Sequence, residues 1–413
     1  MTSVTADTST PRNWAGNHAY AFTRWATPST VDELCELVRD AEAVRALGSR
    51  HSFNAIADSD DLLVDLTGLA SQPRVDAGAS TVTVTPGTRF AEVVAELSET
   101  DLALRNMGSL PHISVCGAMA TGTHGSGVGN QVLAASARRL VIVDGRGTVR
   151  ELRRGEPDFD GAVVGLGAAG LVVEAELDLV PAFRIAQSRE AVAWSEAVGT
   201  VADELADGYS VSVFTRWNDE DPTEILRKRQ VDADSGDPGS VSVPSVLLED
   251  GPHLTEVDRS LPWWQALPHF RIEHQPSFGD EIQSEFFVPV EHTEAALRSL
   301  TEHAADFEPH LIVSELRSVA ADDLWMSPAQ GRDSTCLHFT WHAHPGDVDR
   351  LCTLIQHALD PFEARPHWGK VFDPAAVDVA RLYARLPDYL ELLGRIDPES
   401  RFRNGLLRQL LGG

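Results

Sequence analysis

The segment NMGSLPHISVCGAMATGTHGSGVGN at 106–130 constrains the fold of this chain more than any other feature. Glycine, serine, threonine and alanine make up about half of it. Such small residues let a backbone approach a ligand closely, and their amides can hold a pyrophosphate. The alternative is a flexible glycine-rich loop. However, Ile113, Val115 and Met119 are spaced through the segment, which indicates that it packs against a core.

A second short motif, LGSRHSFN at 47–54, places a histidine just after a predicted strand. Residues 44–47 form that strand, Gly48 ends it, and His51 lies in the tight turn beyond. Backbone amides in such a turn can hold phosphate or flavin oxygens, although an ordinary loop histidine is the alternative. No G-x-G-x-x-G motif opens a helix after the first strand, which argues against a Rossmann dinucleotide domain.

The first 180 residues alternate between short strands and helices. Ser29 and Thr30 stand ahead of Asp32 and Glu33, a capping signal for a helix. Phe90, Val93, Val94 and Leu97 form a second helical face. The alternation of apolar and polar residues predicts the remaining elements, which are strands at 62–66, 81–85 and 171–180 and a hairpin at 138–152.

The amino-acid composition of the chain changes after about residue 184. Residues 216–260 are rich in Asp, Glu, Pro, Gly and Ser, and we expect long loops there. Strands are predicted at 209–217, 282–290, 311–319 and 337–344, and helices at 292–303 and 347–359. An antiparallel sheet covered by helices is the natural arrangement of these elements, which makes the fold class α+β. From about residue 365 the chain returns to short helical segments.

Three motifs in this second half carry polar side chains of chemical interest. In the predicted strand SELRS, Glu315 and Arg317 point to the same face, where they could bind hydroxyl groups, pair with each other or form a plain surface ion pair. In LHFTWHAH, His338 and Thr340 share a face that could line a pocket or be the solvated side of a sheet. In RPHWGKVF, Lys370 is restrained by its neighbours, and such a lysine can act as a base or be purely structural.

Composition excludes several classes of function. The formal net charge of -28 repels phosphate backbones and anionic lipid, so we expect no nucleic-acid partner. The four cysteines (Cys35, Cys116, Cys336 and Cys352) have no metal-ligand spacing, so we expect no metal. We see no signal peptide and no apolar run of about 18 residues, so we expect a cytoplasmic protein that does not enter membranes. A monomer is the expected state.

Together these motifs resemble the vanillyl-alcohol-oxidase-type FAD flavoproteins, and among them the oxidases that act on alditols. The sugar-lactone oxidases are the next most similar group. The resemblance runs from NWAGN at 13–17 to DPESRFRN at 397–404 and keeps the order of the motifs. It implies a two-domain fold of this family, with an antiparallel-sheet substrate domain as a cap. The implied parts are an FAD-binding domain at 12–184, the cap at 185–364, and a C-terminal return to the FAD-binding domain at 365–413.

The resemblance also implies the cofactor and its contacts. In this family the histidine at the position of His51 carries FAD covalently, and a glycine stands where this chain has Arg50. That departure puts the local contacts of the loop in question. The cofactor contacts implied by the matching positions are Gly48, Ser49, Arg50, His51, Ser52, Ser109, Ser114, Gly117, Ala118, Thr121, Leu171 and His367.

The implied reaction is the oxidation of the terminal primary alcohol of alditols such as xylitol and sorbitol to the aldehyde. Hydride goes to the flavin N5, and O2 is reduced to H2O2. Lys370, Arg317 and Glu315 match the catalytic positions, with Lys370 assisting removal of the hydroxyl proton. The implied substrate contacts are Ser109, Glu315, Arg317, His338, Thr340 and Lys370. Gly108 matches a position that leaves room for oxygen beside the flavin.

Three alternatives stay open at this point. The first is a sugar-1,4-lactone oxidase or dehydrogenase of the gulonolactone type, which passes electrons to oxygen or to another acceptor. The second is a flavin-binding module without catalytic activity. The third is a globular protein that binds no flavin, and a colourless purified sample would favour it.

Overall fold

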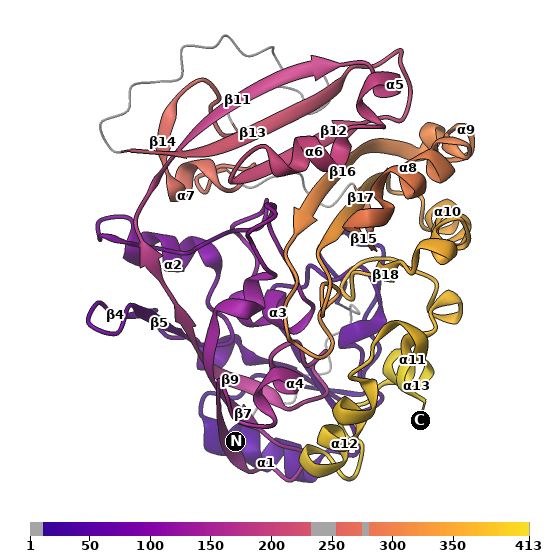
Figure 1. The fold of residues 1–413 in the computed structure, drawn as a ribbon. Helices are drawn as coiled ribbons and strands as arrows, with labels where there is room; N and C mark the ends of the chain where they lie inside the picture. The colour runs from indigo at the N-terminus through magenta and orange to yellow at the C-terminus, as the bar shows by residue number, and fades with distance from the viewer. Residues whose placement is uncertain (1–10, 233–252, 275–280, 413) are drawn as a thin grey trace.

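The computed structural model of the chain describes residues 11–232, 253–274 and 281–412. Its N-terminal part builds two larger sheets and one two-stranded sheet from short strands (Figure 1). The first is parallel, in the order β1 (Arg24–Ala26), β3 (Leu62–Asp65), β2 (Val44–Leu47). The second is antiparallel, in the order β4 (Arg74–Asp76), β5 (Thr81–Val84), β9 (Leu171–Asp178), β7 (Ala137–Val143), β8 (Val149–Arg153). The strands and the hairpin predicted in this part are confirmed to within about two residues at their ends.

Helices and short turns connect these strands. The helices are α1 (Val31–Asp40), α2 (Phe90–Leu97), α3 (Val115–Ala120) and α4 (Phe159–Val163). Single 3-10 turns occupy Ala55–Ala57 (η1), Leu66–Leu69 (η2) and Leu133–Ser136 (η3), and β6 (Leu102–Ala103) pairs with β10 (Val180–Pro181). The predicted cap of α1 is confirmed, because the hydroxyl of Thr30 accepts a hydrogen bond of 3.2 Å from the backbone N–H of Glu33.

The middle of the chain forms one large sheet of eight antiparallel strands, the upper part of Figure 1. Its order is β14 (Ser260–Pro262), β11 (Arg184–Val192), β13 (Thr223–Val231), β12 (Ser210–Thr215), β16 (Leu311–Val319), β17 (Ser334–His342), β15 (Glu281–Pro289), β18 (Arg365–Pro366). The helices of this part are α5 (Trp194–Ala197), α6 (Val201–Ala206), α7 (Trp263–Ala266), α8 (Thr293–Thr301), α9 (Ala304–Phe307) and α10 (Pro345–Leu359). Further 3-10 turns are η4 (Val290–His292), η5 (Glu308–His310) and η6 (Asp360–Phe362). The predicted antiparallel sheet with covering helices is confirmed.

The prediction of long loops across residues 216–260 is wrong in its first part. β13 occupies Thr223–Val231 and pairs along its whole length with β11. Its sequence TEILRKRQV reads as a solvated segment because three of its nine residues are cations. In the structure, however, the strand is flanked on both sides by other strands. Residues 233–252 of the predicted loop lie outside the described residues.

The two faces of the large sheet are chemically different. Phe339 and Trp341 of β17 stack with parallel rings 5.2 Å apart, and Trp217 and Phe307 pack around them. The alternate residues His338 and Thr340 are joined by a hydrogen bond of 3.1 Å on the opposite face. The predicted alternation along β17 is therefore confirmed, and the polar face is free to line a cavity.

The C-terminal segment runs back to the N-terminal part, where α12 contacts α4 (Figure 1). Its elements are η7 (Pro374–Ala376), α11 (Val379–Leu382), α12 (Leu386–Ile396) and α13 (Gly405–Leu411). The side-chain amide of Asn404 donates to the carbonyl oxygens of Ala55 and Asp58 at 2.8 and 2.9 Å, and Arg45 donates to the carbonyl of Phe402 at 2.7 Å. The expected domain boundary at residue 364 falls just before β18. Among the described residues no helix combines the length and apolar character that a membrane crossing needs.

Candidate functional site

A cavity of about 720 Å³ lies where the N-terminal part meets the polar face of the large sheet. That volume is within the usual range for small-molecule and cofactor sites. The structure brings together at its wall all but one of the residues that the sequence singles out: Gly48, Ser49, Arg50, His51, Ser52, Gly108, Ser109, Ser114, Gly117, Ala118, Thr121, Glu315, Arg317, His338, Thr340, His367 and Lys370. The exception is Leu171, which begins β9, pairs with Val143 and is buried in the core.

The loop after β2 and the start of α3 are locked together. Ser49 and Ser114 exchange two hydrogen bonds, each from a backbone N–H to the other's hydroxyl, at 3.2 and 2.9 Å. A Cβ atom at Gly48 would lie 2.4 Å from the hydroxyl oxygen of Ser114, and one at Gly117 would lie 2.6 Å from it. A side chain at either position would displace the Ser114 hydroxyl from its hydrogen bond with Ser49, so glycine lets the backbone lie close to the cavity.

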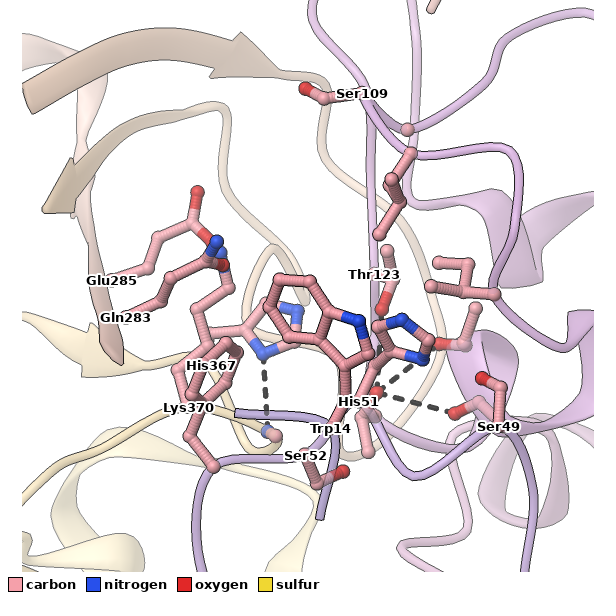
Figure 2. Close-up of a pocket in the computed structure, with 18 of the residues that line it drawn as sticks. Trp14, Ser49, His51, Ser52, Ser109, Thr123, Gln283, Glu285, His367 and Lys370 are labelled. Atoms are coloured by element: carbon pink, nitrogen blue, oxygen red, sulfur yellow. Dashed lines mark hydrogen bonds and ion pairs between the residues drawn. The ribbon is translucent and has the colours of Figure 1, made fainter. Parts of the chain in front are cut away.

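His51 stands in this loop with a nitrogen that the described residues leave without a partner. Its buried Nδ1 makes no hydrogen bond, and its ring stacks on Trp14 with centroids 5.2 Å apart. Figure 2 shows the two rings side by side, with Lys370 and Glu285 to one side and Ser49 to the other. Burial lowers the pKa of His51 to about 4, so the imidazole is neutral at neutral pH. A neutral, unpartnered imidazole nitrogen is a nucleophile that fits a covalent attachment.

Lys370 is held from two sides. Its Nζ lies 2.6 Å from Nδ1 of His338 and 3.0 Å from Oε2 of Glu285. Burial lowers the pKa of Lys370, and the carboxylate of Glu285 works against that shift. Burial and the charge of Lys370 lower the pKa of His338 to about 4, so that ring is neutral.

Glu315 and Arg317 form a hydrogen-bonded ion pair on the cavity face of β16, which is one of the alternatives that the sequence left open. The other oxygen of Glu315, Oε1, lies 2.7 Å from Nε2 of His269. Burial alone would raise the pKa of Glu315, but Arg317 and His269 outweigh it and hold the pKa well below its usual range. The carboxylate is therefore ionised and accepts hydrogen bonds only.

Strand register aligns the polar groups in a row across the sheet. Glu285 of β15 stands opposite His338 of β17, which stands opposite Glu315 of β16. Glu285 also receives a hydrogen bond of 3.1 Å from the buried His124 of the glycine-rich segment. Lys370 and His124 outweigh the effect of burial and hold the pKa of Glu285 well below its usual range. Two carboxylates, one guanidinium and one amine thus share one wall of the cavity.

Sequence reasoning missed several of these groups. Gln283 and Glu285 line the cavity from β15, and His124 and His269 line it from loops. One signal for Glu285 was available, because it is a charged residue directly before the apolar run FFVPV, on a strand that the pattern predicts. No comparable pattern marks the two histidines, since their positions depend on how loops pack.

The group His124, Glu285 and Cys336 brings three ligand types within 4.8 Å of one another. Hydrogen bonds already occupy two of them, since Glu285 contacts His124 and Lys370. Burial raises the pKa of Cys336 well above its usual value, which keeps the thiol protonated and a poor ligand. We therefore assign no metal to this group.

Gly108 and Ser109 lie at the opposite wall, where the glycine-rich segment enters the cavity. A Cβ atom at Gly108 would lie 3.5 Å from the carbonyl oxygen of His124 and 3.8 Å from Thr123, which are ordinary contacts. The carbonyl of Ser109 accepts a hydrogen bond of 3.2 Å from the backbone N–H of Phe270. Figure 2 shows the Ser109 side chain apart from His51 and Lys370.

Comparison with known proteins finds similarity along nearly the whole chain. Residues 23–153 match a family profile described as FAD binding domain, and residues 278–410 match one described as D-arabinono-1,4-lactone oxidase. The chain is 41% identical to alditol oxidase of Streptomyces sp. (strain IKD472 / FERM P-14339), over 97% of this chain and 99% of that protein. It is 28% identical to L-gulono-1,4-lactone dehydrogenase of Mycobacterium tuberculosis, over 97% and 98% of the two chains.

Solved structures share the fold at much lower sequence identity. A solvent-stable cholesterol oxidase superposes with a TM-score of 0.77 at 14% identity, covering 97% of this chain and 96% of that one. A chitooligosaccharide oxidase superposes with a TM-score of 0.76 at 14% identity, covering 98% and 96%. The expected two-part flavoprotein fold is confirmed by these likenesses.

Proposed function

The chain belongs to the alditol oxidase family of FAD-dependent flavoproteins, and from this premise we propose that it oxidises a terminal primary alcohol of an open-chain polyol to the aldehyde. Xylitol and sorbitol are the substrates we favour. Molecular oxygen is the proposed electron acceptor and hydrogen peroxide the second product. The arrangement of groups around the cavity supports each part of this proposal.

The residues of the cavity fit an FAD that is attached at His51. The unpartnered Nδ1 of the neutral imidazole supports a covalent bond to the cofactor. The locked pair of Ser49 and Ser114, with Gly48 and Gly117 beside it, supports close backbone contact with the cofactor. When bound, FAD supplies the acceptor for the hydride and passes the electrons to oxygen.

Glu315 and Arg317 are the groups that we assign to hold the polyol. An ionised carboxylate accepts hydrogen bonds from hydroxyl groups, and a guanidinium donates to their oxygens. Thr340 can donate to a further hydroxyl, because its Oγ1 receives the Nε2–H of His338. Ser109, from the opposite wall, is the proposed contact that fixes the position of the polyol along the cavity.

Lys370 is the group that we assign to take the hydroxyl proton. A neutral amine has two N–H donors and one lone pair. At Lys370 the donors are directed to Glu285 and to Nδ1 of His338. The lone pair then remains for the substrate hydroxyl, and the carboxylate of Glu285 stabilises the ammonium that forms when the proton arrives. The burial of Glu285, whose side chain is 1% exposed, strengthens its attraction for the ammonium.

The single observation that carries the proposal is the occupation of one cavity by three groups. These are an unpartnered imidazole nitrogen, a buried amine held by a carboxylate, and a carboxylate–guanidinium pair. A binding module without catalysis has no need of the buried amine.

A second candidate is a sugar-lactone oxidase or dehydrogenase. The match of residues 278–410 to the D-arabinono-1,4-lactone oxidase profile favours it. The greater identity to alditol oxidase, and the row of donors and acceptors suited to several hydroxyl groups, favour the polyol. For oxygen as acceptor the support is the open space at Gly108.

A panel of polyols and aldonolactones separates these candidates. Peroxide release in air should be fastest with xylitol or sorbitol and weak with gulonolactone. Under nitrogen, the polyol should bleach the yellow colour of the protein. Faster turnover of gulonolactone would favour the second candidate. Bleaching without peroxide release on admission of air would favour a dehydrogenase, and no bleaching with any polyol would overturn the proposal.

A further inference from the structure

The chain contains only two lysines, Lys228 and Lys370, among its 34 basic residues of Lys and Arg type. All other cations of this type are arginines, including those on the surface. Both lysines are in the buried polar network of the cavity. A chain that uses arginine everywhere else keeps an amine at these two positions, which indicates that both need the properties of lysine rather than a cation alone.

Lys228 lies on β13, immediately behind the cavity wall. It is one of the largest fully buried side chains of the described residues, at 1% exposure. Its Nζ donates to the carbonyl oxygen of Leu267 at 2.6 Å and lies 3.4 Å from Nδ1 of His269. A compact amine can reach both acceptors, whereas a planar guanidinium is larger and donates in a fixed fork.

His269 connects this amine to the cavity. Its Nε2 lies 2.7 Å from Oε1 of Glu315 and 3.4 Å from the hydroxyl of Ser212. Burial, reinforced by Lys228, lowers the pKa of His269 to about 4, so the ring is neutral and carries one proton. Because the carboxylate of Glu315 only accepts, that proton is on Nε2. Nδ1 is then an acceptor, and Lys228 is its donor.

We propose that Lys228 is a positioning residue for polyol binding, which through His269 holds the carboxylate of Glu315 in place for the substrate hydroxyls. This inference rests on the proposed function. The chain of contacts runs from Lys228 to His269 to Glu315 to Arg317, each within hydrogen-bonding distance of the next. Without the donor at Nδ1, the imidazole can move its proton to that nitrogen and turn a lone pair towards Glu315.

The charge of Lys228 changes close to neutral pH. Burial lowers the pKa of Lys228 to about 7, with Arg317 adding to that shift and Glu315 opposing it. The charged and titratable groups that face the amine are therefore Glu315 and Arg317 from β16 and His269 from the loop after α7. Loss of the proton weakens the hydrogen bond to His269. The Michaelis constant for the polyol should therefore rise as pH increases through about 7.

The experiment compares Lys228→Met with the matched control Arg227→Met. Arg227 is the neighbouring cation of the same strand, on the opposite face, where it pairs with Glu190 and Asp207 at 2.6 and 3.1 Å. We expect Lys228→Met to raise the Michaelis constant for xylitol about tenfold with little change in kcat, and to remove its pH dependence near neutrality. Arg227→Met should lose stability without either effect. His269→Ala should reproduce the effect of Lys228→Met, and the double variant should add little.

A measurement on the unaltered holoenzyme covers the case in which Lys228→Met does not fold. Labelling with [ε-13C]lysine gives two side-chain signals, because the chain has two lysines. One of them should titrate at about pH 7, and this titration should shift in His269→Ala. With the flavin reduced and air excluded, xylitol should also shift it, because Glu315 then shares its hydrogen bonds with hydroxyl groups.

The outcomes separate the two proposals. Normal oxidation of polyols by Lys228→Met, with an unchanged Michaelis constant, would overturn the role of Lys228 alone. An equal rise of the Michaelis constant in Arg227→Met would also overturn it. So would a lysine signal whose titration changes neither in His269→Ala nor on addition of xylitol. If the unaltered protein oxidised no polyol at all, the proposed function would fail, and the role of Lys228 with it.

Discussion

At the scale of single residues, Lys370 illustrates what a neighbouring carboxylate does to a buried amine. Burial favours the neutral form, which is the form that can accept a proton, and Glu285 favours the charged form, which is the form after transfer. The two influences oppose each other at one atom. An amine under both is suited to gain and lose a proton within one catalytic cycle.

Lys370→Met tests this role directly. We expect the rate at which xylitol reduces the flavin to fall at least about a hundredfold, because methionine cannot accept the hydroxyl proton that we assign to the amine of Lys370. Stopped-flow absorbance under nitrogen measures that rate. The flavin content and melting temperature should stay close to those of the unaltered protein, and a near-normal rate would reject the role of Lys370 as base.

His51→Ala tests the attachment of the cofactor. The variant lacks the only unpartnered imidazole nitrogen that we find in this loop among the described residues. Its flavin should come free in the supernatant on acid precipitation, whereas the unaltered protein should keep its yellow colour in the pellet. Mass spectrometry of the denatured chain gives a second readout, and a flavin adduct that persists in His51→Ala would show that another residue carries the bond.

Sequence reasoning found these two residues because each is in a short motif with a local shape. It found Glu315, Arg317 and Thr340 because alternation along a strand predicts a shared face. It could not find His269 or Lys228, whose importance depends on contacts between β13, β16 and the loop after α7. Those contacts are set by strand order and loop packing, and neither leaves a local pattern.

At the scale of elements, the loop between β2 and η1 contains a backbone strain. Arg50 has a φ of 62°, in the left-handed region that favours glycine. Its guanidinium lies 6.0 Å from the centre of the Trp25 ring, at the outer limit of a cation–π contact, so little compensates for the strain.

Arg50→Gly should therefore stabilise the protein. We expect the free energy of unfolding to rise by roughly 0.5–1 kcal/mol, because the left-handed conformation costs glycine less. Denaturant unfolding of the holoprotein measures it. Arg89→Gly, at an ordinary φ of -96° ahead of α2, is the matched control and should not stabilise. A loss of stability in Arg50→Gly would mean that the arginine makes contacts that outweigh its strain.

The elements themselves were largely predictable. Strand alternation and the capping residues gave β5, β9, β16, β17 and α1 with small errors at the ends. β13 was missed because its cations looked solvated, although Arg227 and Lys228 are both buried. A charged strand becomes plausible only when its partners are known, and here they come from β11, from α6 and from the loop after α7.

At the scale of the whole molecule, the two lysines affect how stability depends on pH. Burial lowers the pKa of Lys228 to about 7, far below its usual value of 10.5, and it also lowers the pKa of Lys370. For Lys228, between about pH 7 and pH 10.5, the unfolded chain therefore binds a proton that the folded chain lacks. The free energy of unfolding therefore rises as pH increases through that window.

We expect stability to increase between about pH 7 and pH 8.5, by up to about 1.4 kcal/mol per pH unit for each lysine with a lowered pKa. The window ends there because cysteine thiols of the unfolded chain begin to ionise above it. Urea unfolding at several pH values measures the slope. Lys228→Met should flatten it, while Arg227→Met should leave it unchanged, and equal slopes in all three proteins would contradict the expectation.

The division of the chain into two parts was only partly predictable from the sequence. The change in composition near residue 184 coincides with the start of β11, and the tail does return to the N-terminal part. Among the contacts that hold the tail, Asn404 donates to backbone carbonyls around residue 56. A single asparagine gives no sign of such a long-range partner.

The scarcity of lysine also has a practical consequence for handling the protein. Lys228 is fully buried, and the side chain of Lys370 is 14% exposed within the cavity, so an acylating reagent meets no fully exposed lysine. Conventional lysine coupling to a solid support should therefore be inefficient, and any lysine that does react should be Lys370, with loss of turnover. The 62 acidic residues offer the better handle, through carbodiimide activation of surface carboxylates.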